Sequence, residues 1–210
     1  METLGKIFGS DSKVKIMRLF LFNPGKVFEV ADVAKRADSS REATKRELAV
    51  LKNAGMIKNK IFVRVATSKV LKGKIRLAKK KVIGWFLNER FTYMKELQNL
   101  LINTILVREE DLVDRLAQAG RIKYIVVSGM FLKQWDSRVD LLVVGDRLKS
   151  RVLESAIRKI ESEVGREIQY AALEVPDFKY RVTMHDRLVR DVFDFPHTVL
   201  LDKLGLKIER

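Results

Sequence analysis

Five residues in the second half of the chain belong to a pattern that is used for phosphoryl transfer: Ser128, Gly129, Ser137, Arg138 and Asp140. The first two end an apolar run at 122–128 and the others begin the next one at 139–144, so both groups flank predicted buried strands. Phosphoryl transfer of this kind needs two or three carboxylates to hold two Mg²⁺ ions. Asp140 is the single acid of the group, and the guanidinium of Arg138 would repel a metal ion.

The stretch SRVDLLVVGD at 137–146, preceded by the Ser128-Gly129 turn, resembles the minimal nucleotidyltransferase domain of the DNA polymerase beta superfamily. The resemblance covers about residues 120–175. The family has a Gly-Ser turn, then Ser-Asp-x-Asp-Leu, and a further carboxylate on a later strand. The resemblance therefore implies metal-binding aspartates at positions 138 and 140.

Three departures from the family pattern predict an inactive domain. The turn is Ser-Gly, Arg138 stands at the first aspartate position, and the predicted strand 167–173 has Gln169 or Ala171 where the later acid belongs. We expect no metal and no cofactor, and a role in sensing a nucleotide effector, in scaffolding or in oligomerisation. The alternative is an active nucleotidyltransferase acting on RNA or protein held by the basic N-terminal half.

Other catalytic and membrane functions find little support in the composition. The chain has no cysteine, which excludes disulfides and thiolate metal sites and fits a reducing cytoplasm. Its histidines, His185 and His197, do not make a metal-ligand set, and Ser128 has no histidine near it in the sequence for hydrolase chemistry. The apolar runs are too short or too polar to cross a bilayer, so we expect a cytoplasmic protein without a membrane partner.

The charge distribution indicates a polyanion-binding first half. The net charge is +15, and residues 1–105 hold 23 Lys and Arg against nine Asp and Glu, whereas residues 106–210 hold 19 against 18. Between Leu48 and Asn88 there are eleven basic residues and no acid. Such segregation is typical of a module that binds a polyanion. Charge alone does not choose between nucleic acid and membrane headgroups.

Helical periodicity and end signals predict three helices in the first half. The first runs from 12 to 22 after the N-cap candidates Ser10 and Asp11, and Asn23-Pro24-Gly25 ends it. The second runs from 29 to 37. The third begins at Ser39, with Glu42 three residues later as in a capping box, and ends with Gly55 as a left-handed C-cap residue.

A change to period two after the third helix predicts a β-hairpin. Residues 61–66 alternate as a strand, Lys72-Gly73 is the expected turn, and residues 75–87 return. With EVADVAKRADSSREATKRELAVLKNAGMIK at 29–58, this order resembles a winged helix-turn-helix over about residues 10–88. The resemblance implies that the third helix enters the major groove of DNA and that the hairpin is a wing.

Helix and hairpin geometry assign candidate DNA-binding residues. Outward residues near the start of the third helix can reach base edges, with Arg41 the best candidate for a guanine: Ser39, Ser40, Arg41, Thr44 and Lys45. Thr44 also falls on the inward stripe with Leu48 and Leu51. Cations at the hairpin tip would contact phosphates or the minor groove: Lys69, Lys72, Lys74 and Arg76. Lys79, Lys80 and Lys81 would add sequence-independent attraction. Each of these cations has an ordinary solvated surface position as its alternative.

Residues 89–119 are predicted to be helical, with an apolar stripe at Phe91, Met94, Leu97, Leu101 and Ile105. Winged helices that bind palindromic DNA commonly pair through an added helix, so we expect a homodimer formed through Tyr93–Leu106. Packing of the stripe on its own domain is an equal alternative. The remainder reads as β-α-β, with a helix at 149–164, a strand at 167–173 and a helix at 178–194.

These patterns together predict an α+β chain of three parts: a winged helix-turn-helix with a long basic wing (1–90), a helical connector (91–119) and a mixed-sheet nucleotidyltransferase-like α/β domain (120–210). The expected function is that of a sequence-specific regulator of transcription that binds double-stranded DNA and has no enzymatic activity. An RNA-binding adaptor is a further alternative.

Overall fold

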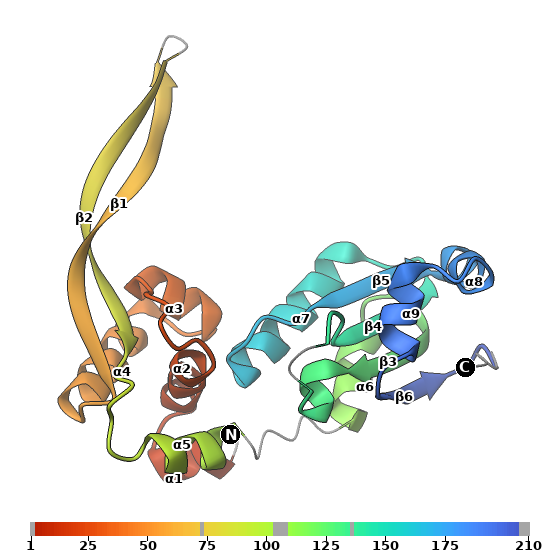
Figure 1. The fold of residues 1–210 in the computed structure, drawn as a ribbon, viewed down its shortest axis with the longest axis horizontal. Helices are drawn as coiled ribbons and strands as arrows, with labels where there is room; N and C mark the ends of the chain where they lie inside the picture. The colour runs from red at the N-terminus through yellow and green to blue at the C-terminus, as the bar shows by residue number, and fades with distance from the viewer. Residues whose placement is uncertain (1–2, 72–73, 103–108, 135–136, 206–210) are drawn as a thin grey trace. The chain divides into compact units, whose positions relative to one another are not determined.

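A computed structural model of the chain describes residues 3–71, 74–102, 109–134 and 137–205, and for 64–71, 74–78, 109 and 110 it describes the backbone alone. These residues form an α+β protein with two small sheets (Figure 1). The chain divides into two compact units, Met1–Ile105 with Ser162–Arg166, and Leu106–Glu161 with Glu167–Arg210. The predicted turn Lys72-Gly73 and the residues 103–108 lie outside the described part.

The first unit contains helices packed around one apolar core: α1 (Thr3–Phe8), α2 (Asp11–Phe22), α3 (Val30–Arg36), α4 (Arg41–Asn53) and α5 (Met94–Leu101). Ile16 and Phe20 of α2 and Leu48 of α4 are completely buried in this core. The sequence predicts α2, α3 and α4 but not α1, which has only six residues and no acid in its first turn.

The start of α4 corrects one detail of the predicted helix. Its N-cap is Ser40, whose hydroxyl accepts a hydrogen bond from Ala43 N at 3.2 Å, and not Ser39 in a capping box with Glu42. The Ser39 N–H instead donates to Ala34 O at 3.0 Å and so closes the end of α3. Because the Ser39 N–H belongs to the end of α3, Ser40, whose backbone is extended, is the residue that caps α4. The C-cap prediction is confirmed, because Gly55 has a φ of 82°.

The hairpin is longer than predicted. Strands β1 (Ile57–Leu71) and β2 (Lys74–Leu87) form a two-stranded antiparallel sheet. Phe28, which follows α2, exchanges two backbone hydrogen bonds of 2.8 Å with Trp85 of β2. A Cβ at Gly84 would overlap both the Phe62 ring and Val27, so glycine is required where the hairpin leaves the core.

The apolar stripe of α5 packs on its own unit. Leu101 is completely buried in the first core, and Met94 and Leu97 pack against it. The Arg18 guanidinium Nε donates to Leu101 O at 3.0 Å. The stripe therefore does not form a free dimer surface, and the homodimer stays a prediction without this contact. The next helix, α6 (Glu109–Ala117), packs on the second sheet, so the predicted connector is shared between the units.

The second unit is built on a four-stranded mixed sheet in the order β5-β4-β3-β6. Strand β3 is antiparallel to both β4 and β6, whereas β4 and β5 are parallel. A 3₁₀ turn, η1 (Gly129–Leu132), follows β3. The elements in chain order after α6 are β3 (Arg121–Ser128), β4 (Leu141–Asp146), α7 (Ser150–Val164), β5 (Tyr170–Glu174), α8 (Val175–Thr183), α9 (Arg187–Phe193) and β6 (His197–Asp202).

Helices α8 and α9 cover one face of this sheet. The Tyr124 ring of β3 stacks on Phe178 of α8 at 5.6 Å and lies 6.4 Å from Phe193 of α9. Burial raises the pKa of the Tyr124 phenol, and the neighbouring Asp202 carboxylate raises it further. The aromatic cluster therefore stays uncharged at neutral pH.

The predicted helix 178–194 is wrong as one element, since it is divided into α8 and α9. His185 has a left-handed backbone (φ 49°), and the Asp186 carboxylate accepts a hydrogen bond from Leu188 N at 2.8 Å as the N-cap of α9. The predicted strand 167–173 begins later, at Tyr170. Asp186 begins α9 by accepting a backbone hydrogen bond, and Asp140 accepts one from Gln169 N just before β5. Apolar periodicity alone does not indicate such boundaries.

Candidate nucleic-acid interface and the Asp140 loop

Helix α4 presents three exposed cations on the side away from the core. Arg41, Lys45 and Arg46 are all exposed, whereas Leu48 and Leu51 are buried. Positions 41 and 45 are one turn apart and therefore lie on one face, with 46 beside them. Glu42 is exposed at the same end of the helix and would repel a phosphate.

Thr44 is wrongly predicted as a DNA-contacting residue. Its exposed fraction is 0%, and its hydroxyl oxygen has no hydrogen-bond partner among the described residues. It lies on the inward stripe with Leu48 and Leu51, and a side chain in that position cannot reach a base edge. The cationic face of α4 therefore consists of the residues on either side of it.

The two serines before α4 make different contacts. Ser39 is half-buried, and its hydroxyl donates to Ser12 Oγ of α2 at 3.1 Å, which ties the end of α3 to the core. Ser40 is exposed, but its oxygen already accepts the capping hydrogen bond. Of the two, only Ser40 lies where a phosphate could approach the first turn of α4.

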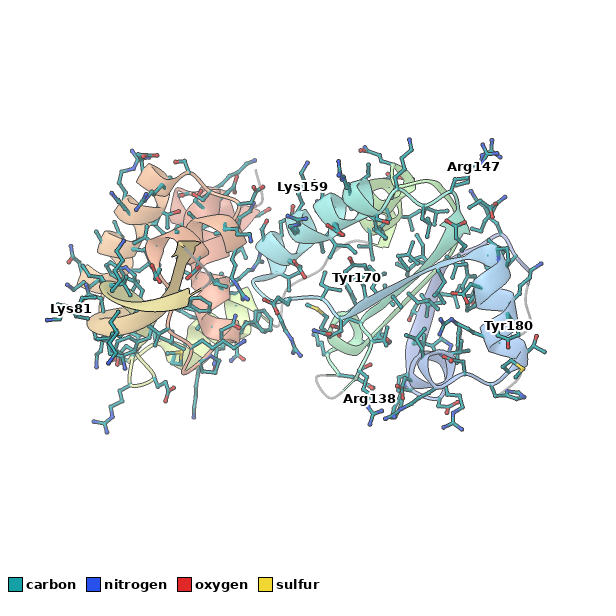
Figure 2. All side chains as sticks on the ribbon, turned by 90° about the horizontal axis from the view of Figure 1, so that it is seen from above. Lys81, Arg138, Arg147, Lys159, Tyr170 and Tyr180 are labelled. Atoms are coloured by element: carbon teal, nitrogen blue, oxygen red, sulfur yellow. The ribbon has the colours of Figure 1, made fainter. Side chains whose placement is uncertain are left out.

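The β1/β2 ribbon (residues 57–71 and 74–87) extends the cationic surface. Lys79, Lys80 and Lys81 are exposed as predicted, and Figure 2 shows the Lys81 side chain pointing outward. The side chains of Lys69, Lys74 and Arg76, and the whole of Lys72, lie outside the described part, so their predicted contacts stay predictions.

On α4 and β1, sequence reasoning did not consider the exposed cations Arg46, Lys58 and Lys60. Arg46 could have been found from its position next to Lys45, since both fall outside the apolar stripe. Lys58 and Lys60 were not considered because the predicted strand begins only at 61. Lys60 Nζ lies 5.3 Å from the centre of the Phe86 ring, which holds its stem along the ribbon.

The positive charge of this surface is not neutralised within the described residues. Where the structure describes side chains, no carboxylate is within ion-pair distance of Arg41, Lys45 or Arg46, nor of Lys79, Lys80 or Lys81. By contrast, the Nζ of half-buried Lys13 on α2 is 3.6 Å from a Glu47 carboxylate oxygen. An uncompensated cationic surface attracts polyanions and repels copies of itself.

Asp140 in the second unit is a buried structural acceptor. Its exposed fraction is 2%. One carboxylate oxygen accepts a hydrogen bond from Met130 N and the other from Gln169 N, each at 2.9 Å. The side chain thus joins the turn after β3 to the segment before β5. Both of its oxygens are engaged by the backbone, which leaves them poorly suited to coordinate a metal.

Residues around Asp140 also form hydrogen bonds or packing contacts within the same loop. Ser128 Oγ and Ser137 Oγ both donate to Val139 O, the latter at 2.8 Å. Gly129 has a left-handed backbone (φ 54°), and a Cβ there would overlap the Asp140 carboxylate. The polar side chains of Ser128, Ser137 and Asp140 are thus all engaged by backbone atoms.

No family model, curated protein or solved structure matches this chain.

Arg138, the substitution in the transferase-like pattern, points to a different partner. Its guanidinium is 3.6 Å from the Asp191 carboxylate of α9, and Figure 2 shows it at the outer edge of its unit. Asp140 therefore does not pair with Arg138; its hydrogen bonds hold local backbone structure. Within the described residues, no group of three or more Asp, Glu, His or Cys side chains could hold a metal ion.

The structure brings His197 next to Ser128, which the sequence does not suggest. The two residues face each other across β3 and β6. The Ser128 hydroxyl is buried and donates to Val139 O, while His197 Nδ1 is 2.8 Å from Phe195 O. A serine that donates to the backbone is not activated by the histidine, so the pair lacks the hydrogen bond that nucleophilic catalysis requires.

No helix within the described ranges is both long and apolar enough to cross a membrane.

Replacement of Thr44 by valine tests its burial. Valine has nearly the same shape and removes a buried hydroxyl without a partner, so we expect the free energy of unfolding to rise by about 1–2 kcal/mol. Thermal or urea denaturation followed by circular dichroism measures it. Thr44→Ser, which keeps the hydroxyl and removes the methyl group, should destabilise the unit. A stability of Thr44→Val below that of the wild type would contradict this account of the site.

Replacement of Asp140 by asparagine tests the structural role of the carboxylate. Asparagine has one acceptor oxygen, so one of the two backbone N–H groups loses its partner, and we expect a loss of about 1–3 kcal/mol. Asp146→Asn on β4 is the control, because the described residues give this carboxylate no ion pair or side-chain hydrogen bond. Equal stability of the two variants in urea denaturation would show that Asp140 does not stabilise the link between the turn after β3 and the segment before β5.

Proposed function

We propose that the chain is a sequence-specific regulator of transcription that binds double-stranded DNA through a winged helix-turn-helix. The order α2, α3, α4 and then the β1/β2 ribbon is that of this motif. The pairing of Phe28 with Trp85 supports the assignment, because it holds the ribbon beside the helices as a wing. In such a motif α4 lies in the major groove.

The observation that carries this proposal is the uncompensated charge of one continuous part of the chain. Exposed cations on α4 are followed by exposed cations on the ribbon, and the sequence from Leu48 to Asn88 contains no acid. Arginine and lysine on a helix that fits the major groove can read guanine, and cations on the ribbon can contact phosphates. A membrane surface would not require a protruding helix flanked by a ribbon.

The second unit is proposed to be an inactive relative of the minimal nucleotidyltransferases. Support comes from the engagement of both Asp140 oxygens by backbone N–H groups and from the ion pair of Arg138 with Asp191. Its remaining roles are scaffolding, oligomerisation or response to a nucleotide effector. A homodimer on a palindromic site remains part of the proposal, through a surface other than the buried stripe of α5.

Duplex binding and its salt dependence test the proposal directly. We expect affinity for duplex DNA to fall steeply with salt, with a slope of log affinity against log salt of about −5 to −9 for six to ten phosphate contacts. Fluorescence anisotropy with labelled duplexes selected from a random pool gives the slope. Tighter binding of RNA than of duplex DNA at equal salt would favour the RNA-adaptor alternative, and no selectable duplex would reject sequence recognition.

Arg41 should read one base pair. We expect Arg41→Ala to cost about 1–3 kcal/mol of binding free energy and to relax selection at one position. The same selection repeated with the variant measures this. Arg90→Ala, which removes an exposed arginine of the same unit outside α4 and the ribbon, is the matched control. Equal losses on all sequences would make Arg41 a phosphate contact.

A further inference from the structure

Where its side chains are described, the β1/β2 ribbon packs against the helical core near its base. Ile57 and Leu87 are buried in the first core, Trp85 is paired with Phe28, and Val27 lies against Gly84. At the next pair outward the situation changes. Ile61 is 70% exposed and its partner Ile83 is 53% exposed. The ribbon therefore leaves the core at the Ile61–Ile83 pair.

The part beyond this pair is long for a hairpin. The antiparallel register continues from Ile61–Ile83 to Ser68–Arg76, and after an irregularity ends with Leu71–Lys74. At about 3.3 Å per residue, ten further residues of β1 span about 33 Å. One turn of B-DNA is about 34–36 Å. Figure 1 shows the ribbon extending well past α2, α3 and α4 of its unit.

The free ribbon bears positive charge on both faces. Strand alternation assigns Lys79 and Lys81 to the same face as Val63, and Lys80 to the opposite face with Lys60. These four lysines are exposed. A partner that neutralises the ribbon must therefore present negative charge on two sides of it.

Taken alone, such a ribbon is poorly stable. An isolated two-stranded hairpin is marginal in water, and Lys79, Lys80 and Lys81 follow one another on the same strand of it. Apolar residues at 61, 63 and 83 are exposed along it. A polyanion bound on both sides of the ribbon would offset this charge repulsion.

We propose that the ribbon is an arm that follows a groove of duplex DNA for about one helical turn beyond the α4 contact. The proposal rests on the DNA binding proposed above. A groove has phosphates on both walls, and the major groove, about 12 Å wide, admits a two-stranded ribbon. Exposed Ile61, Val63 and Ile83 can contact thymine methyl groups on its floor. If the partner were a second copy of the ribbon, its positive charge would repel the first. A flat anionic surface would contact only one face of the ribbon.

Hydroxyl-radical footprinting on a selected duplex tests the arm. The wild type should protect the α4 site and a flank of about 10 base pairs on one side. In the shortened variant, Asn-Gly replaces residues 64–80 and closes the hairpin after Val63. It should keep the α4 protection, which also shows that it folds, and lose the flank. The arm is rejected if the shortened variant still protects the flank or if the wild type never does.

A full-length variant tests the same arm without shortening it. Lys79→Gln, Lys80→Gln and Lys81→Gln together should lower the steepness of the salt slope by about 2.7 if each lysine contacts a phosphate. The charge-matched control is Lys149→Gln, Lys179→Gln and Lys203→Gln, three exposed lysines of the second unit, which should leave the slope unchanged. An unchanged slope in the ribbon variant overturns the arm. Absence of protection on any duplex by the wild type would instead reject DNA binding itself.

Discussion

Two backbone hydrogen bonds between Phe28 and Trp85 are the constraint on which the first unit depends. Residue 28 precedes α3 and α4, and residue 85 lies near the end of β2, so this one pairing closes a segment of more than fifty residues on itself. The buried Phe20 and Phe28 rings, in edge contact at 5.7 Å, hold the junction against α2. Helix α4 and the base of the ribbon are therefore parts of one rigid body. Cations on both are pre-organised, which lowers the entropic cost of binding an extended partner.

The same closure explains how the unit tolerates its charge. The core on the inner side of α2 and α4 is mainly apolar, with Ile16, Phe20 and Leu48 completely buried, and Arg18 and Thr44 are also buried there. The exposed lysines of the ribbon lie outside this core, so their mutual repulsion acts where the side chains are solvated.

In the second unit one carboxylate has a structural role where the family pattern has a metal ligand. Asp140 needs Gly129, because any side chain there would overlap its oxygens, and it needs the backbone of the turn to be left-handed. Local packing is thus sufficient to account for Gly129 and Asp140 at these positions. A motif in which Gly129, Ser137 and Asp140 are retained while position 138 is arginine can maintain the turn without maintaining the chemistry.

The helices, caps and strands that were predicted correctly depend on interactions between residues close in the sequence. Apolar periodicity and caps predicted α2, α3, α4, the hairpin and the left-handed Gly55, and apolar runs predicted β3, β4 and β5 of the second sheet but not β6. The errors concern interactions between distant residues. Thr44 satisfies both the outward and the inward pattern of α4, and only the packing of Leu48 and Leu51 against α2 decides that it is buried.

The same limit applies to the partners of charged and polar groups. Nothing near Arg138 in the sequence points to Asp191, and nothing near Ser128 points to His197, because both neighbours arise from the order in which strands and helices are assembled. Residue type and spacing can therefore nominate a cation or a carboxylate for a site. Whether it is available depends on what the rest of the chain brings to it. Arg41 has no described carboxylate within ion-pair distance, whereas both oxygens of Asp140 accept hydrogen bonds from backbone N–H groups.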